Sequence, residues 1–259
     1  MIGLLFILFL FAAIIFSMLG IGGGILFVPM LLQAGFDFHQ AASIALAVMV
    51  VLSATAAAVY HFEKLVDWKI VLILEPFSFI GAYLAGYYSG LFPVWILKIL
   101  LASIMLISAF LMLRAPKPQE PIKRGRPGFI HTKKGGDDYF INLWAGIPLT
   151  FIAGCLSALL GLGGGFAKVP MMTLIFRVPV KVAVATSSAM IVITALSGFM
   201  GHAAAGHVNY KLSAILAVAA GIGAFIGSKV SITAKKELLS RMFSIMLVIL
   251  AAWMIYKAV

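Results

Sequence analysis

The feature that most constrains this chain is a series of long apolar runs separated by short loops. About 20 apolar residues cover the hydrocarbon core of a bilayer as one α-helix. Of the 259 residues, 63% are hydrophobic and 10% are charged, whereas a soluble domain carries about 25% charged residues. We therefore expect an all-α polytopic protein of the plasma membrane and exclude a soluble globular domain. The runs that are long enough to span lie at 2–19, 40–60, 70–90, 93–113, 141–160, 182–201, 212–230 and 238–256.

An internal repeat divides the chain into two halves. The segment LGIGGGILFVPM at 19–30 matches LGLGGGFAKVPM at 160–171 at 8 of 12 positions, with an offset of 141 residues. The tetrapeptide at 103–106 recurs at 244–247 with the same offset. A repeat of this length predicts two homologous halves, 1–113 and 141–259, joined by a polar linker, 114–140.

Two further apolar stretches, 25–34 and 166–176, are too short to span and directly follow the glycine clusters. We interpret them as half-helices. Each half is then a helical hairpin with a glycine turn, followed by three spanning helices.

The distribution of basic residues predicts the topology. The linker is the most basic segment, so we place it in the cytoplasm by the positive-inside rule. Lys64 and Lys69, and later Arg177 and Lys181, lie in loops that share its side only if the second half is inverted. We therefore expect two inverted-topology repeats, with a parallel arrangement as the alternative. The net charge of +11 belongs to these short loops, so we expect the lipid bilayer as a partner and no nucleic acid. A homo-oligomer stays open.

The glycine turns are candidate ligand sites. Irregular backbone at membrane depth must be buried in protein or face a water-filled cavity. Glycine allows close backbone approach, and the half-helix behind each turn offers free N–H groups and a positive dipole end. Two such turns predict a small-anion site near the midplane, and tight helix packing is the alternative. The predicted substrate-binding glycines are Gly22, Gly23, Gly24, Gly163, Gly164 and Gly165.

Five polar residues complete the candidate site. Lys168 is the only charged residue in either half-helix, and it either compensates the anion or extends to the membrane surface. The hydroxyls of Ser43, Thr186 and Ser187 either orient an oxyanion or pack between helices. Glu75 is the only acid well inside a spanning run, so it is either a proton-coupling carboxylate or a structural partner for a lysine.

We find no sequence pattern of an enzyme. The chain has one cysteine, Cys155, which excludes a multi-cysteine metal site within the chain. No HExxH, Walker loop, paired carboxylate or nucleophile with a matching base occurs. We expect no catalytic residue, no metal and no cofactor.

The duplicated motif G-x-GGG-x-x-x-x-P resembles that of the TauE/SafE family of sulfite and organosulfonate exporters. It runs from Gly20 to Pro29 and from Gly161 to Pro170, and Ala185-Thr186-Ser187 adds to the resemblance. The first half departs from it, with Ala42-Ser43-Ile44. The resemblance implies a secondary transporter, working as an exporter, for a small sulfur-containing anion such as sulfite or an organosulfonate. Alternating access around a midplane site is the expected mechanism, and a passive small-anion channel is the alternative.

Overall fold

The computed structural model describes residues 2–20, 22–93, 127–134 and 137–234, together with a few single positions. The predicted spanning runs 93–113 and 238–256, and most of the linker, fall mainly on residues outside this part of the chain. The observed helices, strands and contacts are those of the described residues.

Six long helices are apolar enough to cross a membrane, and they confirm the six predicted runs that the structure describes. The two predicted half-helices are also present, as α2 (Gly24–Gln33) and α7 (Gly165–Pro170), and α7 continues into a π-helical turn, Met171–Ile175. A 3-10 turn, Ser89–Leu91, follows α4. The long helices are α1 (Ile2–Leu19), α3 (Phe38–Phe62), α4 (Trp68–Tyr87), α6 (Leu143–Leu160), α8 (Val180–Ala204) and α9 (Tyr210–Thr233).

Side-chain caps explain where four of these helices begin. The Asp37 carboxylate accepts a hydrogen bond from the Gln40 amide at 3.0 Å, at the start of α3. Equivalent bonds are made by Asp67 before α4, Asn142 before α6 and Asn209 before α9. Such caps satisfy amides that have no partner inside the helix. The short polar loops therefore determine the starts of apolar segments whose interiors contain few signals of their own.

The two halves repeat in helix bounds and in packing. α1 begins at Ile2 and α6 at Leu143, an offset of 141, while α3 and α8 have 25 residues each and begin 142 apart. α1 packs against α9 and α6 against α4, so each first helix contacts the last described helix of the other half. α3 and α8 pack against each other and, respectively, against α9 and α4. The packing partners thus exchange between the halves.

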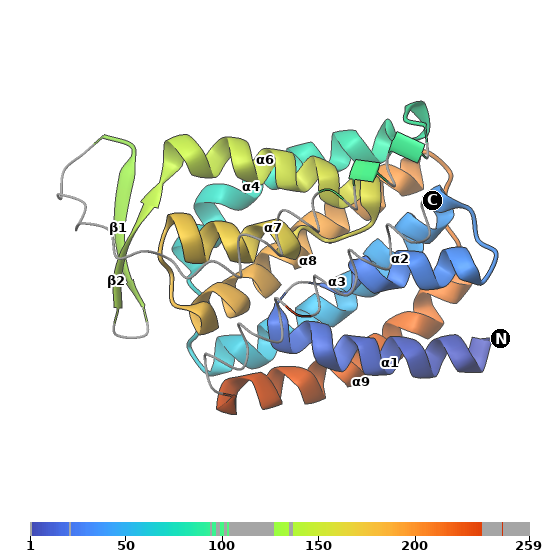
Figure 1. Cartoon of the computed structure of the whole chain (residues 1–259), viewed down its shortest axis with the longest axis horizontal. Helices are drawn as coiled ribbons and strands as arrows, with labels where there is room; N and C mark the ends of the chain where they lie inside the picture. Colours follow the sequence, from blue (N-terminus) through green and yellow to red (C-terminus); the bar gives the residue numbers. More distant parts are fainter. Residues whose placement is uncertain are drawn as a thin grey trace.

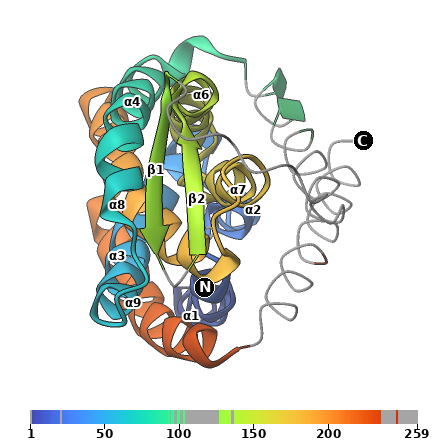
Figure 2. The same ribbon diagram turned by 90° about the vertical axis from the view of Figure 1, so that its left-hand side faces the viewer.

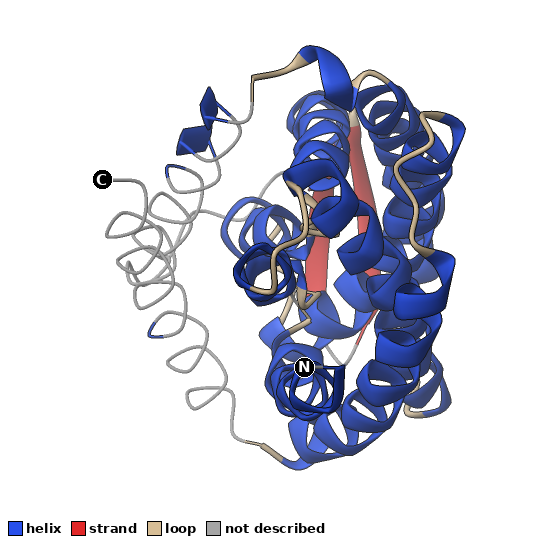
Figure 3. Cartoon of the chain, turned by 90° about the vertical axis from the view of Figure 1, so that its right-hand side faces the viewer, coloured by secondary structure: helices blue, strands red, loops and turns tan. Residues whose placement is uncertain are grey.

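Equivalent helices run in opposite directions. Figure 1 shows α1 starting at the end where the chain begins, while α6 starts beside the strands at the opposite end. His39 at the start of α3 stacks on His207 between α8 and α9, with ring centroids 5.1 Å apart, so these two loops share one end of the bundle. Figure 3 views the bundle from this end. This course agrees with inverted repeats, and the orientation in the membrane stays a prediction.

A β-hairpin at the other end was not predicted from the sequence. β1 (Phe129–Lys134) pairs antiparallel with β2 (Asp137–Asn142). Part of the predicted linker is therefore a β-ribbon, and the run expected from 141 becomes helical at Leu143. The two strands lie across one end of the helical bundle (Figure 2).

The hairpin is attached through one buried carboxylate. Asp67 is 4% exposed and accepts hydrogen bonds from the Tyr139 hydroxyl at 2.6 Å and the Thr132 hydroxyl at 3.1 Å. Tyr139 and Ile141 are buried in an apolar cluster with residues of α3, α4 and α8. The hairpin is therefore part of the packed core at this end.

The outer faces of the helices are apolar, whereas one lysine and one glutamate are enclosed between the helices. Large hydrophobic side chains such as Leu4, Phe11 and Leu72 are between 61% and 73% exposed. Lys168 and Glu75 are 0% and 1% exposed. Apolar outer faces suit a lipid environment, in which exposed charges are expensive.

Candidate functional site

The two glycine turns meet inside the bundle. A Cβ atom built on Gly24 would lie 1.9 Å from the carbonyl oxygen of Gly161 and 2.6 Å from the Cα atom of Leu162. Only glycine allows the first turn to approach the second this closely. Segments 141 residues apart in the sequence therefore come into direct backbone contact, through Gly24 of the first turn and Gly161 and Leu162 of the second.

The two central helices border this meeting point. The Gly24 amide donates to the sulfur of Met49 on α3 at 2.9 Å. A Cβ atom on Gly163 would lie 2.2 Å from the Met49 methyl carbon and 3.0 Å from Ile191 of α8. Met49 and Ile191 are 142 residues apart, which is the offset between α3 and α8. The flexible methionine is the movable side chain at this point.

Each half-helix directs its N-terminus at the turns. Within α7 the first hydrogen bonds are donated by the Ala167 and Lys168 amides, both to the Gly164 carbonyl. The amides of Gly165 and Phe166 lie ahead of this ladder. Gly164 precedes the helix with φ of 82°, a left-handed conformation that favours glycine. The geometry thus provides the backbone donors that an anion would require.

Lys168 and Glu75 form a buried ion pair beside the second turn. The Lys168 Nζ atom lies 2.9 Å from Oε2 and 3.0 Å from Oε1 of Glu75. The Thr194 hydroxyl contacts both groups, and it lies 2.9 Å from the Ser78 hydroxyl. The Lys168 Cε atom is 3.4 Å from where a Gly164 Cβ would be. Among the described residues, Lys168 is the only fully buried cation.

This pairing refines two sequence alternatives. Lys168 is directed at a carboxylate inside the bundle, and Glu75 has the lysine partner that one of its alternatives required. A buried charge is tolerated when it is paired and hydrogen-bonded. An anion-binding role for Lys168 and a proton-coupling role for Glu75 stay predictions.

The three predicted hydroxyls lie in different places. Ser187 donates to the Gly20 carbonyl at 2.8 Å and so attaches α8 to the first turn. The Thr186 hydroxyl accepts from the Asp67 amide at 2.9 Å, towards the hairpin end. Ser43 is buried, and its hydroxyl has no hydrogen-bond partner among the described residues. Ser187 and Thr186 thus have protein partners, and the role of Ser43 as a donor to an anion stays a prediction.

Sequence reasoning missed three polar neighbours of the second turn: Thr194, Ser78 and Ser157. Ser157 is buried, and its hydroxyl has no partner in the described part of the chain. Its Cβ atom lies 3.6 Å from the position of a Gly164 Cβ. Ser78 follows Glu75 by three residues and thus shares its helix face, which is a signal that could have identified it.

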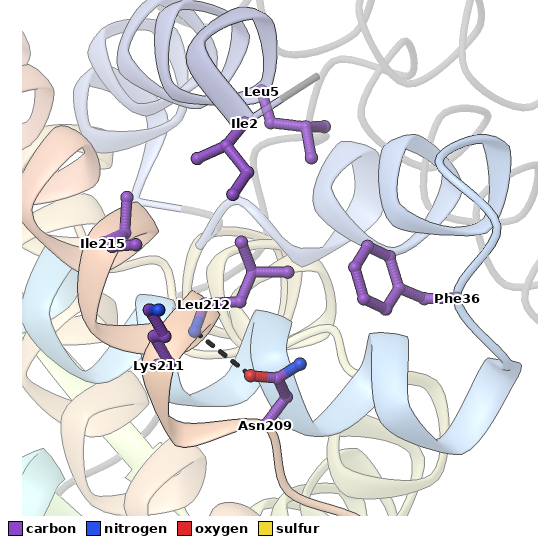
Figure 4. A pocket seen from close by; sticks show the side chains of 7 residues that line it. All are labelled: Ile2, Leu5, Phe36, Asn209, Lys211, Leu212 and Ile215. Carbon is purple, nitrogen blue, oxygen red and sulfur yellow. Dashed lines mark hydrogen bonds between the residues drawn. The ribbon is translucent and has the colours of Figure 1, made fainter.

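A pocket at the end where the chain begins is separate from these residues. Figure 4 shows Phe36, Asn209 and Lys211 among its lining, and the Asn209 side chain caps α9 through the Leu212 amide at 3.2 Å. None of the predicted site residues lines this pocket. We therefore do not include it in the candidate site.

Six long apolar helices enclosing a charge pair define a multi-pass membrane protein. The chain belongs to the sulfite exporter TauE/SafE family, whose model matches residues 5–254. The family is one of membrane transporters, and its match covers nearly the whole chain. No solved structure is significantly similar to it.

Curated relatives support the assignment. The chain is 33% identical over 275 residues to the probable membrane transporter protein YunE of Bacillus subtilis, covering 99% of this chain and 98% of the relative. It is 25% identical to a probable membrane transporter protein of Methanocaldococcus jannaschii, over 94% and 92% of the two chains. A shorter match, 30% identical over 37% of this chain and 22% of the relative, is to sulfite exporter TauE/SafE family protein 3 of Arabidopsis thaliana.

Proposed function

We propose that this protein is a secondary transporter, working as an exporter, for a small sulfur-containing anion such as sulfite or an organosulfonate. The observation that carries the proposal is the meeting of two glycine turns beside the buried cation Lys168. Family membership supports the substrate class, and the turns support an anionic ligand of small size.

In this proposal the anion binds at the second turn. Backbone amides at the start of α7 donate to its oxygens, and Lys168 compensates its charge. Ser43, which is buried without a partner among the described residues, adds a hydroxyl donor. Gly22, Gly23 and Gly24 form the opposing backbone surface, and Ser187 holds that surface through Gly20.

The repeated packing supports alternating access as the mechanism of this proposal. Because packing partners exchange between the halves, a rearrangement at one end of the bundle has an equivalent at the other end. We assign the hairpin end to the cytoplasm because basic residues gather there, whereas Lys211 is near the opposite end. The basic residues of the hairpin end are Lys64, Lys69, Lys133, Lys134, Arg177 and Lys181.

The test of binding is a thermal-shift screen of the purified protein in detergent with sulfite, thiosulfate, sulfoacetate, taurine and sulfate. Lys168→Ala should lower the affinity for the stabilising anion by roughly 10- to 150-fold, which corresponds to about 1.5–3 kcal/mol for a hydrogen bond to a charged group. Lys211→Ala is the matched control and should retain the parent affinity. If Lys168→Ala binds the anion as tightly as the parent protein, Lys168 is not part of the binding site. If no anion stabilises the parent protein, the proposed function is contradicted.

Site-directed labelling tests the orientation in a Cys155→Ala background. Lys133 is exposed on the hairpin and Ala204 is exposed at the opposite end. An impermeant maleimide should label Lys133→Cys from the cytoplasmic side and Ala204→Cys from the external side. Labelling of both from one side would contradict the assigned orientation.

A further inference from the structure

The ion pair uses the full donor capacity of the proposed binding lysine. An ammonium group has three N–H donors. In Lys168 they are directed at Oε1 of Glu75, at Oε2 of Glu75 and at the Thr194 hydroxyl. An anion can therefore receive a hydrogen bond from Lys168 only if one of these three contacts is released.

The charge balance shows which contact must change. The groups facing Glu75 from the packed elements are Lys168 of α7, Thr194 of α8 and Ser78 of its own helix. Lys168 is the only other charged group among them, so the empty site is neutral. A bound anion would make the buried site negative, which is costly in a medium of low dielectric. For an anion of charge −1, one proton on Glu75 restores neutrality.

We propose that the anion displaces Glu75 from Lys168 and that Glu75 takes up one proton as it is displaced, so that anion and proton bind together. This proposal rests on the proposed function. Lys168 remains an ammonium, one O–H bond forms on the Glu75 carboxyl with a proton from water, and no other covalent bond changes. The loaded site carries the same net charge as the empty one.

Transport is then electroneutral co-transport of an anion and a proton. The membrane potential does no work on the loaded or the empty site, because both are neutral. Reactions that form a sulfur oxyanion acid inside a cell release both the anion and a proton. Co-export removes both products, so an outward gradient of the acid is sufficient to drive the cycle.

Proton linkage predicts the pH dependence of binding. Because anion binding takes up a proton, affinity must rise as pH falls. The rise approaches tenfold per pH unit where Glu75 is ionised in the empty protein and protonated in the complex. A static structural pair with the anion bound elsewhere gives an affinity that does not depend on Glu75 at any pH.

The experiment is titration calorimetry of the full-length protein with isethionate, a sulfonate that does not titrate near neutral pH. Titrations in two buffers of different ionisation enthalpy give the number of protons taken up. We expect about one proton per anion in the parent protein and none in Glu75→Gln. Thr194→Val is the matched control, since it keeps both charges and should retain the proton uptake.

The outcomes separate this proposal from the proposed function. Anion binding without proton uptake in the parent overturns the coupling and leaves the binding site intact. If sulfite is the only anion that binds, its own titration adds protons to the measured uptake. The uptake by Glu75→Gln is then subtracted from the uptake by the parent, which removes this contribution. Failure of every anion to bind the folded parent overturns the proposed function.

A liposome assay covers the case in which Glu75→Gln does not fold. With the parent protein alone, isethionate uptake should be driven by an inward proton gradient and should not change when a potassium diffusion potential is applied. Uptake that follows the potential and ignores the proton gradient would overturn the coupling.

Discussion

Beside the second glycine turn lies a buried charge pair, whereas the equivalent positions beside the first turn are all apolar. The repeat offset is 141 for the half-helices and 142 for the helices that come after them. Around the second turn we compare Lys168, Glu75, Thr194 and Ser78. Their equivalents around the first turn are Phe27, Ala217, Leu52 and Ala220.

Packing around the first turn leaves little room for a ligand. The Phe27 ring stacks on Phe9 with centroids 4.3 Å apart and meets Phe16 edge-on at 6.2 Å. A Cβ atom on Gly23 would lie 2.1 Å from this ring, whereas the nearest atom to the equivalent point on Gly164 is 3.4 Å away. The duplicated backbone therefore has two uses: an aromatic cluster holds the first turn, and the second turn is left for polar chemistry.

The supporting bonds are nevertheless equivalent in the two halves. The Tyr60 hydroxyl donates to the Ser17 carbonyl at 2.8 Å, and the His202 Nε2 atom lies 2.9 Å from the Ala158 carbonyl. These residues correspond by the same offsets. Each bond attaches the end of a central helix to the residue three positions before a turn. The scaffold is thus repeated, and only the residues beside the turns differ in chemistry.

The largest expected effect concerns the contact between the turns. Gly24→Ala would place its Cβ atom 1.9 Å from a backbone oxygen that has no flexible side chain to move, so we expect a loss of folded protein. Gly164→Ala meets only backbone strain, about 1–3 kcal/mol for a left-handed residue. Size-exclusion chromatography of both variants measures the difference. Equal folded yields would contradict the close approach of the turns.

The next largest effect tests how much the buried charges of Lys168 and Glu75 stabilise each other. Lys168→Met leaves the Glu75 carboxylate buried without its cation, and breaking such a pair costs about 3–5 kcal/mol. Adding Glu75→Gln removes the uncompensated charge, so the double variant should recover most of the lost thermal stability. Melting temperatures of the two single variants and the double variant give the coupling. Additive losses would show that the two charges do not stabilise each other.

The helices were predictable from the sequence, whereas the identity of the lysine that pairs with Glu75 was not. Long apolar runs determine spanning helices almost by length alone, and α2 and α7 follow from runs too short to span. Glu75 and Lys168 are 93 residues apart, and no local period relates them. Only the packing of α4 against α6 and α8 brings the carboxylate to the second turn.

The hairpin had a sequence signal that the linker prediction passed over. Two short runs that contain aromatic and β-branched residues flank Gly135-Gly136, with Phe129 and Ile130 in the first and Tyr139 and Ile141 in the second. A glycine pair between such runs is typical of a β-hairpin. The charged residues of this segment favoured a polar linker instead. The contact that holds the hairpin could not be predicted locally, because Asp67, the partner of Tyr139, is far away in the sequence.

A smaller effect tests the equivalence of the supporting bonds. Tyr60→Phe leaves the Ser17 carbonyl without its hydroxyl donor, which should cost about 1–3 kcal/mol of stability. His202→Phe removes the corresponding bond to Ala158 and should cost a similar amount. Comparable losses in melting temperature would support a repeated scaffold. A loss confined to one of the two variants would show that the bonds are equivalent in position only.

The smallest effects separate an available hydroxyl from an occupied one. Ser187 already donates to Gly20, so Ser187→Ala should cost about 1 kcal/mol of stability and leave anion affinity close to that of the parent.

Ser43→Ala removes a buried hydroxyl that has no partner among the described residues, so it should leave the melting temperature unchanged or slightly raised. If Ser43 donates to the anion, the same change should weaken binding by roughly 2- to 10-fold, the scale of a neutral hydrogen bond of about 0.5–1.5 kcal/mol. Measuring melting temperature and anion affinity on both variants distinguishes the two roles. A stability loss in Ser43→Ala with unchanged affinity would assign that hydroxyl to packing beside the turns.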